Sequence, residues 1–323
     1  MKSLARMILL GSMFLTACDD AKPETEPAPA ASSASASAPD PTAASASASA
    51  SASASAPVAL PEQPDDFALV EPATPTCPPE MVRVKKSYCV DRYEASLVDT
   101  ETGQDLSPYY VPSRKQALSI QKLWEQERLA VGPAEAREMA LPPLPPWQSQ
   151  RNFEPKAVSK KSRIPQGYLT GPLAALACKN AGKRLCSLSE WQTACRGEDD
   201  RNFPYGDTYE QSKCNIFREA HPAGLLHGNP SIGHSDPRLN TVKAGDKPLL
   251  RRTGETRACT SRWEGDGIAD MVGNIDEWID DPEGTFVGGF YARSKKDGCA
   301  SMVRAHPFDY FDYSTGVRCC KDL

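Results

Sequence analysis

The 323-residue sequence predicts a compact α+β domain that is rich in loops and stapled by disulfide bonds. Three observations predict it. Ten cysteines, an even number, follow a segment typical of an export signal, and such cysteines form disulfides in exported chains. The helices and strands that local patterns indicate are all short. The stretch 196–262 is rich in Gly, Pro, Asn and Asp without periodicity, which favours ordered loop.

Residues 1–17 are typical of a signal peptide, because a basic start precedes a short apolar stretch, Met7–Thr16. Leu15-Thr16-Ala17-Cys18 resembles the lipobox of bacterial lipoproteins, which implies a diacylglyceryl group on Cys18 at the mature N-terminus. We therefore expect an exported, membrane-anchored lipoprotein that faces the periplasm or the cell exterior. Ordinary cleavage after Ala17 is the alternative.

Residues 18–76 are expected to form a lipidated, disordered tether. Between positions 21 and 60, 32 of 40 residues are Ala, Ser or Pro. Such a stretch buries nothing apolar to offset the entropy lost on ordering, and its prolines interrupt the alternative, an alanine-rich helix. The tether allows a domain at 77–323 to stand away from the membrane.

The predicted domain is almost neutral, with 34 Lys and Arg against 33 Asp and Glu in residues 77–323. A neutral surface without a basic stripe has no long-range field that attracts phosphate backbones, so nucleic acid is not an expected partner. No apolar run reaches the length of a membrane span.

The domain is expected to open with a hairpin. Met81–Val84 alternates in polarity, Lys85–Ser87 turns, and Tyr88–Ala95 returns. Cys77 and Cys89 bracket this hairpin and are expected to pair.

Three helices are expected. One spans Lys115–Leu129 and precedes an extended connector, Leu141–Trp147. The second, Thr170–Gly182, has a proline in its first turn and a glycine at its end. The third, Ser187–Gly197, opens with a capping box of Ser187 and Glu190.

Short strands are expected at Phe286–Tyr291 and Thr315–Cys319. Cys319 and Cys320 are adjacent. They form either a strained vicinal disulfide or, as we expect, two bonds to different partners on opposite sides of a strand.

Several short motifs lie in register along 77–323. They are Val90-Asp91-Arg92-Tyr93-Glu94, Ala177-Cys178 with Ala181-Gly182-Lys183-Arg184-Leu185, Glu190-Trp191 with Ala194-Cys195-Arg196-Gly197, Phe203-Pro204-Tyr205-Gly206, Asp270-Met271-Val272-Gly273-Asn274 with Glu277-Trp278, Gly288-Gly289 and Gly316-Val317-Arg318-Cys319. Their order and spacing resemble the formylglycine-generating enzyme, or sulfatase-modifying factor, family. The resemblance implies a C-type-lectin-like fold and leaves 99–165 as a poorly matched insertion.

The resemblance also implies two disulfides. The family joins a cysteine on the first helix to the terminal Gly-x-Arg-Cys, and a cysteine on the second helix to one shortly before the end. Here these are Cys178–Cys319 and Cys195–Cys299. The pairing of four others stays open: Cys186, Cys214, Cys259 and Cys320.

Formylglycine formation in the family uses copper(I) held by two thiolates, which favour a soft ion. The resemblance places both thiolates between Gly288-Gly289 and Cys299, where this chain has no cysteine. Arg293 stands at the first position, and Ser294 or a neighbour at the second. Since Cys299 is needed for the link to Cys195, copper is not expected.

Related family members hold non-haem iron with three histidines. The candidates here are His221, His227 and His234, but their spacing in a Gly- and Pro-rich loop is typical of solvated histidines, so iron is not expected. Structural zinc is not expected either, because the chain has no CxxC pair.

Calcium is the metal that the sequence favours, because it prefers carboxylate and carbonyl oxygens. The resemblance implies the Asp270 and Glu277 side chains and the Gly273 and Ile275 carbonyls as ligands. The alternative is a set of solvated acids on a turn.

A second family calcium site would use Asn215 and the Ile216 carbonyl. Its acidic partner is not assigned, and Asp236 is a guess.

Two functions are compatible with this sequence. The first is a tethered, non-catalytic module that binds an extracytoplasmic peptide, glycan or envelope protein, because the metal thiolates are missing. The second is a metal-dependent oxidoreductase of the family with an altered metal site, because the scaffold is retained.

Overall fold

The computed structural model describes residues 76–216, 220–293 and 296–323. The expected signal peptide 1–17, Cys18, the tether up to residue 75 and Ser294 lie outside the described residues. Within the described part, no helix has the length and apolar character needed to cross a membrane.

The helices are α1 (Arg114–Glu127), α2 (Ala134–Glu138), α3 (Pro146–Gln150), α4 (Gly171–Asn180), α5 (Leu188–Arg196) and α6 (Pro222–His227), with 3₁₀ turns at Leu239–Thr241 and Gly298–Ala300. The strands are β1 (Met81–Val84), β2 (Tyr88–Asp91), β3 (Ala95–Asp99), β4 (Pro155–Ser159), β5 (Arg184–Leu185), β6 (Lys243–Ala244), β7 (Lys247–Pro248), β8 (Thr260–Trp263), β9 (Asp266–Ala269), β10 (Asp276–Trp278), β11 (Phe286–Val287), β12 (Met302–Val303), β13 (Thr315–Val317) and β14 (Cys319–Asp322).

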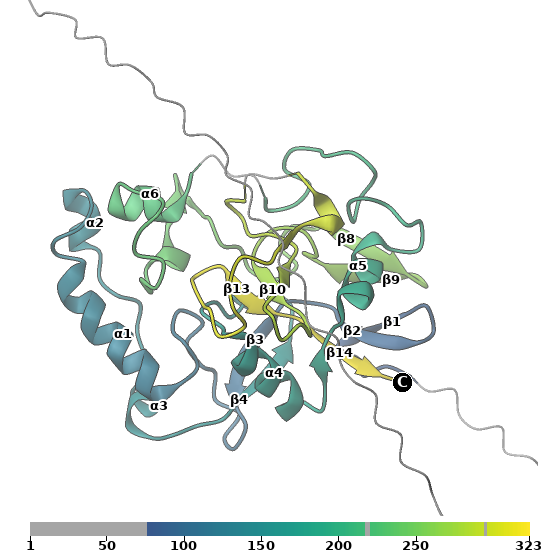
Figure 1. Cartoon of the computed structure of the whole chain (residues 1–323), viewed down its shortest axis with the longest axis horizontal. Coiled ribbons are helices and arrows are strands. Elements are labelled where there is room, and N and C mark those ends of the chain that lie inside the picture. Colours follow the sequence, from purple (N-terminus) through teal and green to yellow (C-terminus); the bar gives the residue numbers. More distant parts are fainter. Residues whose placement is uncertain (1–75, 217–219, 294–295) are drawn as a thin grey trace, which may run out of the picture. The chain divides into compact units, whose positions relative to one another are not determined.

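Two four-stranded sheets organise the domain (Figure 1). One has the order β1-β2-β14-β5, so the first hairpin pairs with the last strand of the chain. The other has the order β12-β11-β10-β13, in which only β10 and β13 run parallel. Short helices beside small sheets, with long loops between them, confirm the predicted α+β fold.

The expected hairpin is present, with Met81 opposite Asp91 and Val84 opposite Tyr88. Its turn places Lys85 and its neighbour at φ values of 48° and 57°, the left-handed region that tight hairpin turns require. All four residues of β2 are buried, because this strand lies between β1 and β14.

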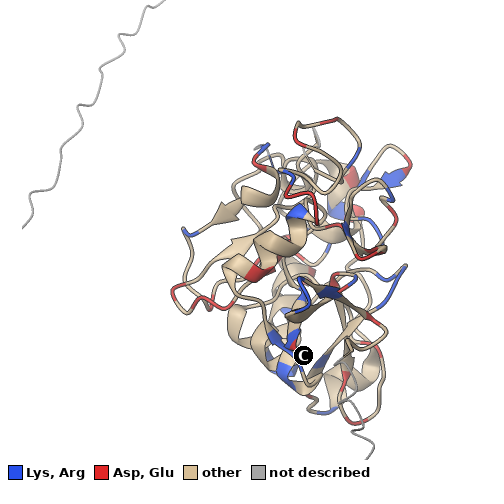
Figure 2. Cartoon of the chain, turned by 90° about the vertical axis from the view of Figure 1, so that its right-hand side faces the viewer, with Lys and Arg blue, Asp and Glu red and all other residues tan. Residues whose placement is uncertain are grey.

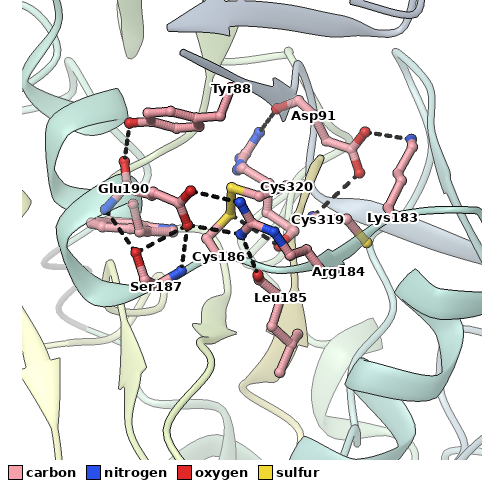
Figure 3. The surroundings of a disulfide bond; sticks show 12 residues. Tyr88, Asp91, Lys183, Arg184, Leu185, Cys186, Ser187, Glu190, Cys319 and Cys320 are labelled. Atoms are coloured by element: carbon pink, nitrogen blue, oxygen red, sulfur yellow. Dashed lines mark hydrogen bonds and ion pairs between the residues drawn. A yellow bond between two sulfur atoms is a disulfide. The ribbon is translucent and has the colours of Figure 1, made fainter. Parts of the chain in front are cut away.

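Helices α4 and α5 begin at the predicted caps. The Thr170 side chain accepts a backbone hydrogen bond in the first turn of α4, at 3.3 Å. Ser187 and Glu190 form the capping box of α5 (Figure 3). Glu190 also pairs with Arg184 of β5 at 2.7 Å, and its carbonyl accepts from the Tyr88 hydroxyl at 2.9 Å. These bonds fasten α5 to β2 and β5.

Disulfides join helices, loops and strands through the whole domain. The adjacent residues Cys319 and Cys320 bond to different partners, since successive side chains of a strand point to opposite sides; Figure 3 shows the second of these bonds. Five disulfides indicate an oxidising, extracellular or periplasmic compartment. The pairs are Cys77–Cys89, Cys178–Cys319 and Cys195–Cys299, as expected, and Cys186–Cys320 and Cys214–Cys259, whose pairing was open.

The insertion 99–165 contains α1, α2, α3 and β4, and β4 returns to pair with β3. Helix α1 buries Ala117, Ile120 and Trp124. The expected extended connector Leu141–Trp147 is wrong at its end, because α3 starts at Pro146, and proline is tolerated in the first turn of a helix.

The expected strand Phe286–Tyr291 ends early, at Val287. Gly288 and Gly289 have φ values of 88° and 76°, which interrupt the extended backbone. A Cβ on Gly288 would lie 3.0 Å from the Met271 carbonyl and 3.1 Å from the Trp191 ring, so this close approach requires glycine.

Candidate functional site

The chain after Gly289 brings Arg293 to the start of β10. Arg293 forms an ion pair with Asp276, and its guanidinium carbon lies 4.9 Å from the centre of the Phe290 ring. The Asp276 carboxylate is buried and also accepts a hydrogen bond from the Ser314 hydroxyl at 3.4 Å. The side chain at position 293 is therefore a cation bound to a buried carboxylate.

Burial raises the pKa of Asp276 to about 7; the Arg293 charge opposes this shift, and the Asp312 carboxylate adds to it. Asp312 accepts from the Tyr310 hydroxyl at 2.8 Å and from the backbone of Ser314 at 2.7 Å. Arg293 Nε is buried and has no hydrogen-bond partner among the described residues. Arg293 thus neutralises one of two neighbouring carboxylates and keeps unused hydrogen-bonding capacity.

The ten cysteines of the described residues are all in disulfides, and Cys299 is bonded to Cys195. Copper(I) in a two-thiolate site needs deprotonated, unbridged sulfur donors. The residues present in the described part of the chain therefore do not fit that metal.

The three candidate histidines have separate partners. His221 Nε2 lies 3.1 Å from the Tyr313 hydroxyl, whereas His227 Nε2 lies 3.4 Å from an Asp236 oxygen. Burial lowers the pKa of both His221 and His227, which favours neutral rings. The expectation that all three are solvated is wrong for His227, because α6 carries it into a buried cluster beside α1.

The segment expected to bind calcium forms the tight connection between β9 and β10. The Asp270 carboxylate accepts a hydrogen bond from the Gly254 backbone at 2.6 Å. The Gly273 carbonyl accepts from the Ile275 backbone at 2.8 Å. Both oxygens of Glu277 accept from Arg318 Nε at 3.1 Å, and one also accepts from the Trp191 indole at 2.6 Å.

Glu94 is a buried acid that was not among the ligands expected from the sequence. Its Oε2 accepts from the Asn274 side chain at 2.8 Å, while its Oε1 is buried without a partner among the described residues. The Asp270 and Glu277 charges raise its pKa further above the ordinary value, after burial itself. The sequence signal was an acid directly before the apolar strand β3.

Three buried carboxyls, those of Glu94, Asp270 and Glu277, share one buried guanidinium, that of Arg318. Burial raises the pKa of Asp270 to about 7, and Glu277 adds to the shift. A hard divalent cation would supply the missing positive charge, and Glu94 Oε1 is an available acceptor. Within the described ranges, no group of three or more acidic, His or Cys side chains is arranged to hold a metal by itself. Backbone carbonyls would therefore have to complete such a site.

The segment of the second expected site lies beside the first. Asn215 and Gly273 form a parallel bridge, and the Asn215 carbonyl accepts from the Asn274 backbone at 2.8 Å. Ile216 is buried in the adjoining core cluster. The guessed acidic partner, Asp236, is instead paired with Arg238 at 2.7 Å.

The model of the sulfatase-modifying factor enzyme 1-like domain matches residues 147–323, which is more than half of the chain. The chain belongs to the sulfatase-modifying factor family. The matched region contains α4, α5, the segment 270–277 and Arg293. The hairpin β1–β2 and most of the insertion lie before it.

Solved structures with a similar fold include CarF, with 13% identity, 73% of this chain and 86% of that chain covered, and a TM-score of 0.33. PvdO from Pseudomonas aeruginosa has 15% identity, 73% and 80% coverage, and a TM-score of 0.32. The Major Tropism Determinant I1 variant has 12% identity, 76% and 53% coverage, and a TM-score of 0.38. These similarities are limited to the fold. No curated protein matched the sequence.

Proposed function

We propose that this protein is an envelope-tethered, non-catalytic binding module of the sulfatase-modifying factor family, whose ligand is an extracytoplasmic peptide, glycan or protein. The Arg293–Asp276 ion pair is the observation that carries the proposal. Arginine stays protonated in proteins, so it repels a metal ion and cannot act as its ligand.

The disulfides support the same proposal. Cys299 follows the Arg293 segment, and its bond to Cys195 ties the 3₁₀ turn at Gly298–Ala300 to α5. Its sulfur therefore serves as a cross-link, which is a structural use of a family cysteine.

Formylglycine formation provides the direct test. The mature lipoprotein, purified from membranes in detergent with its disulfides intact, is incubated with copper(I), oxygen and a peptide that carries a sulfatase-type cysteine. Mass spectrometry should find no aldehyde product, while a copper-dependent family enzyme in parallel should produce it. Repeated turnover by this protein would contradict the proposal.

We also propose calcium as a structural ion of the domain. Its ligands would be the Asp270 and Glu277 side chains with the Gly273 and Ile275 carbonyls, and Glu94 would contribute its negative charge from beside the site. The unpaired Glu94 oxygen and the excess of buried carboxyls over guanidinium groups support this assignment. The cation would hold the connection between β9 and β10 in place.

A further inference from the structure

A cavity of about 570 Å³ opens beside α5, between the β1–β2 turn and the β8–β9 hairpin. Its lining includes Lys85, Gln192, Arg196, Glu198, Asp200 and Trp263. Its lining residues do not include Arg293 or Asp312, and none of them lies in the segment 270–277. Its size falls within the roughly 300–1,000 Å³ of known small-ligand sites.

The charges around this cavity balance. Two cations, Lys85 and Arg196, face two acids, Glu198 and Asp200. On the side of the domain that carries α5, β8 and β9, basic and acidic positions alternate along the backbone (Figure 2). A balanced site gives no long-range attraction to a polyanion or a polycation.

Several polar groups of the cavity have unused hydrogen-bonding capacity. Among the described residues, the Lys85 ammonium and the Gln192 amide make no hydrogen bond, and neither residue takes part in an ion pair. Arg196 Nε is buried without a partner, and Arg196 Nη1 lies 3.4 Å from the Asp200 carboxylate, at the limit of a hydrogen bond. These donors lie beside carboxylate acceptors, so a ligand must both accept and donate.

The apolar part of the cavity is small. Trp263 is its large apolar lining side chain, and only 5% of it is exposed, because it packs in a buried core cluster. Its indole donates to the Ala194 carbonyl at 3.0 Å. A ligand whose affinity depends on apolar burial finds little surface here.

We propose that this cavity binds a neutral oligosaccharide. Hydroxyl groups both donate and accept, so they can receive hydrogen bonds from Lys85, Gln192 and Arg196 and donate to Glu198 and Asp200. This inference rests on the proposed binding function and names the ligand class of that module.

The test is calorimetric titration of the mature lipoprotein, in a detergent without a sugar headgroup, with cellotriose, maltotriose and tri-N-acetylchitotriose. Lys85→Ala and Lys86→Ala form a matched pair, because both residues occupy the same turn and only Lys85 lines the cavity. We expect at least one trisaccharide to bind, with affinity reduced fivefold or more in Lys85→Ala and in Gln192→Ala and unchanged in Lys86→Ala.

Three outcomes would overturn the inference: no binding of any trisaccharide, equal affinity in all variants, or tighter binding of a tetraglutamate peptide that the same two substitutions abolish. The last outcome would assign an anionic ligand instead. The aldehyde assay is independent of these titrations, so failure of this inference and failure of the non-catalytic proposal are distinguishable.

Discussion

Arg293 and Asp276 form an ion pair in which the guanidinium side chain is 22% exposed and the carboxylate side chain 1% exposed. The pair fastens the loop after β11 to the start of β10. The side chain at position 293 is therefore the charge partner of a buried acid.

The first prediction concerns this pair. Arg293→Ala leaves the Asp276 carboxylate buried and unpaired. Such a loss costs about 3–5 kcal/mol when both partners are buried, and partial exposure of Arg293 reduces our expectation to about 2 kcal/mol. Urea denaturation measures this loss in the free energy of unfolding. Arg163→Ala is the matched control, because its ion pair with Asp105 is 36% and 59% exposed, and it should cost less than about 1 kcal/mol. Equal losses in the two variants would count against the account.

The second prediction concerns calcium. Adding calcium to the chelator-treated protein should raise the melting temperature, since an ion that binds only the folded state at 100 times its Kd adds about 2.7 kcal/mol. Glu94→Gln should abolish most of this rise without lowering the melting temperature of the calcium-free protein, because it removes a charge that Asp270 repels. Glu101→Gln, at an exposed acid, should leave the rise intact. Scanning calorimetry measures the calcium-dependent rise in melting temperature of both variants. An unchanged rise in Glu94→Gln would remove this residue from the site.

The third prediction concerns pH. The pKa of Asp270 and that of Asp276 are each raised to about 7 in the folded chain, against about 3.9 when unfolded. Between these values the folded state binds more protons than the unfolded state, so without calcium these two groups lower the free energy of unfolding as pH rises from about 4 to about 7. Calcium needs deprotonated carboxylates, so its affinity should fall as pH drops below 7. Calcium titrations at pH 8 and pH 6 test the sign of this dependence. Tighter calcium binding at pH 6 would contradict the prediction.

The fourth prediction compares two disulfides. Cys77–Cys89 closes a loop of 12 residues and Cys178–Cys319 one of 141. Loop-closure entropy predicts losses of about 2.8 and about 5 kcal/mol when each pair is replaced by serines. Guanidinium denaturation of the two double variants measures the difference. A larger loss for the short loop would show that strain or packing dominates over chain entropy.

Local signals in the sequence predict the elements that local interactions form. The caps at Thr170 and Ser187, the alternating hairpin around Lys85 and the amphipathic α1 all depend on residues a few positions apart. The early end of the strand at Val287 was also encoded locally, by two glycines with positive φ, but the pattern of apolar residues masked it.

The features that the sequence does not predict depend on contacts between distant segments of the chain. Glu94 lies beside Asp270 in the fold, although more than 170 positions separate the two residues in the sequence. Nothing in the sequence around Glu94 shows that one of its carboxylate oxygens lacks a hydrogen-bond partner. The burial of His227 depends on the insertion, because Trp124 of α1 covers it. The pairing of Arg293 with Asp276 likewise depends on how the loop after β11 packs against β10.

Peptide mapping of the alkylated, unreduced protein shows whether any cysteine sulfur is free to bind a metal. We expect that none of the ten cysteines from Cys77 to Cys320 takes up iodoacetamide and that Cys299 is recovered joined to Cys195. Alkylated Cys299, or copper bound at this residue in the native protein, would show a sulfur donor free for metal chemistry and would contradict the account.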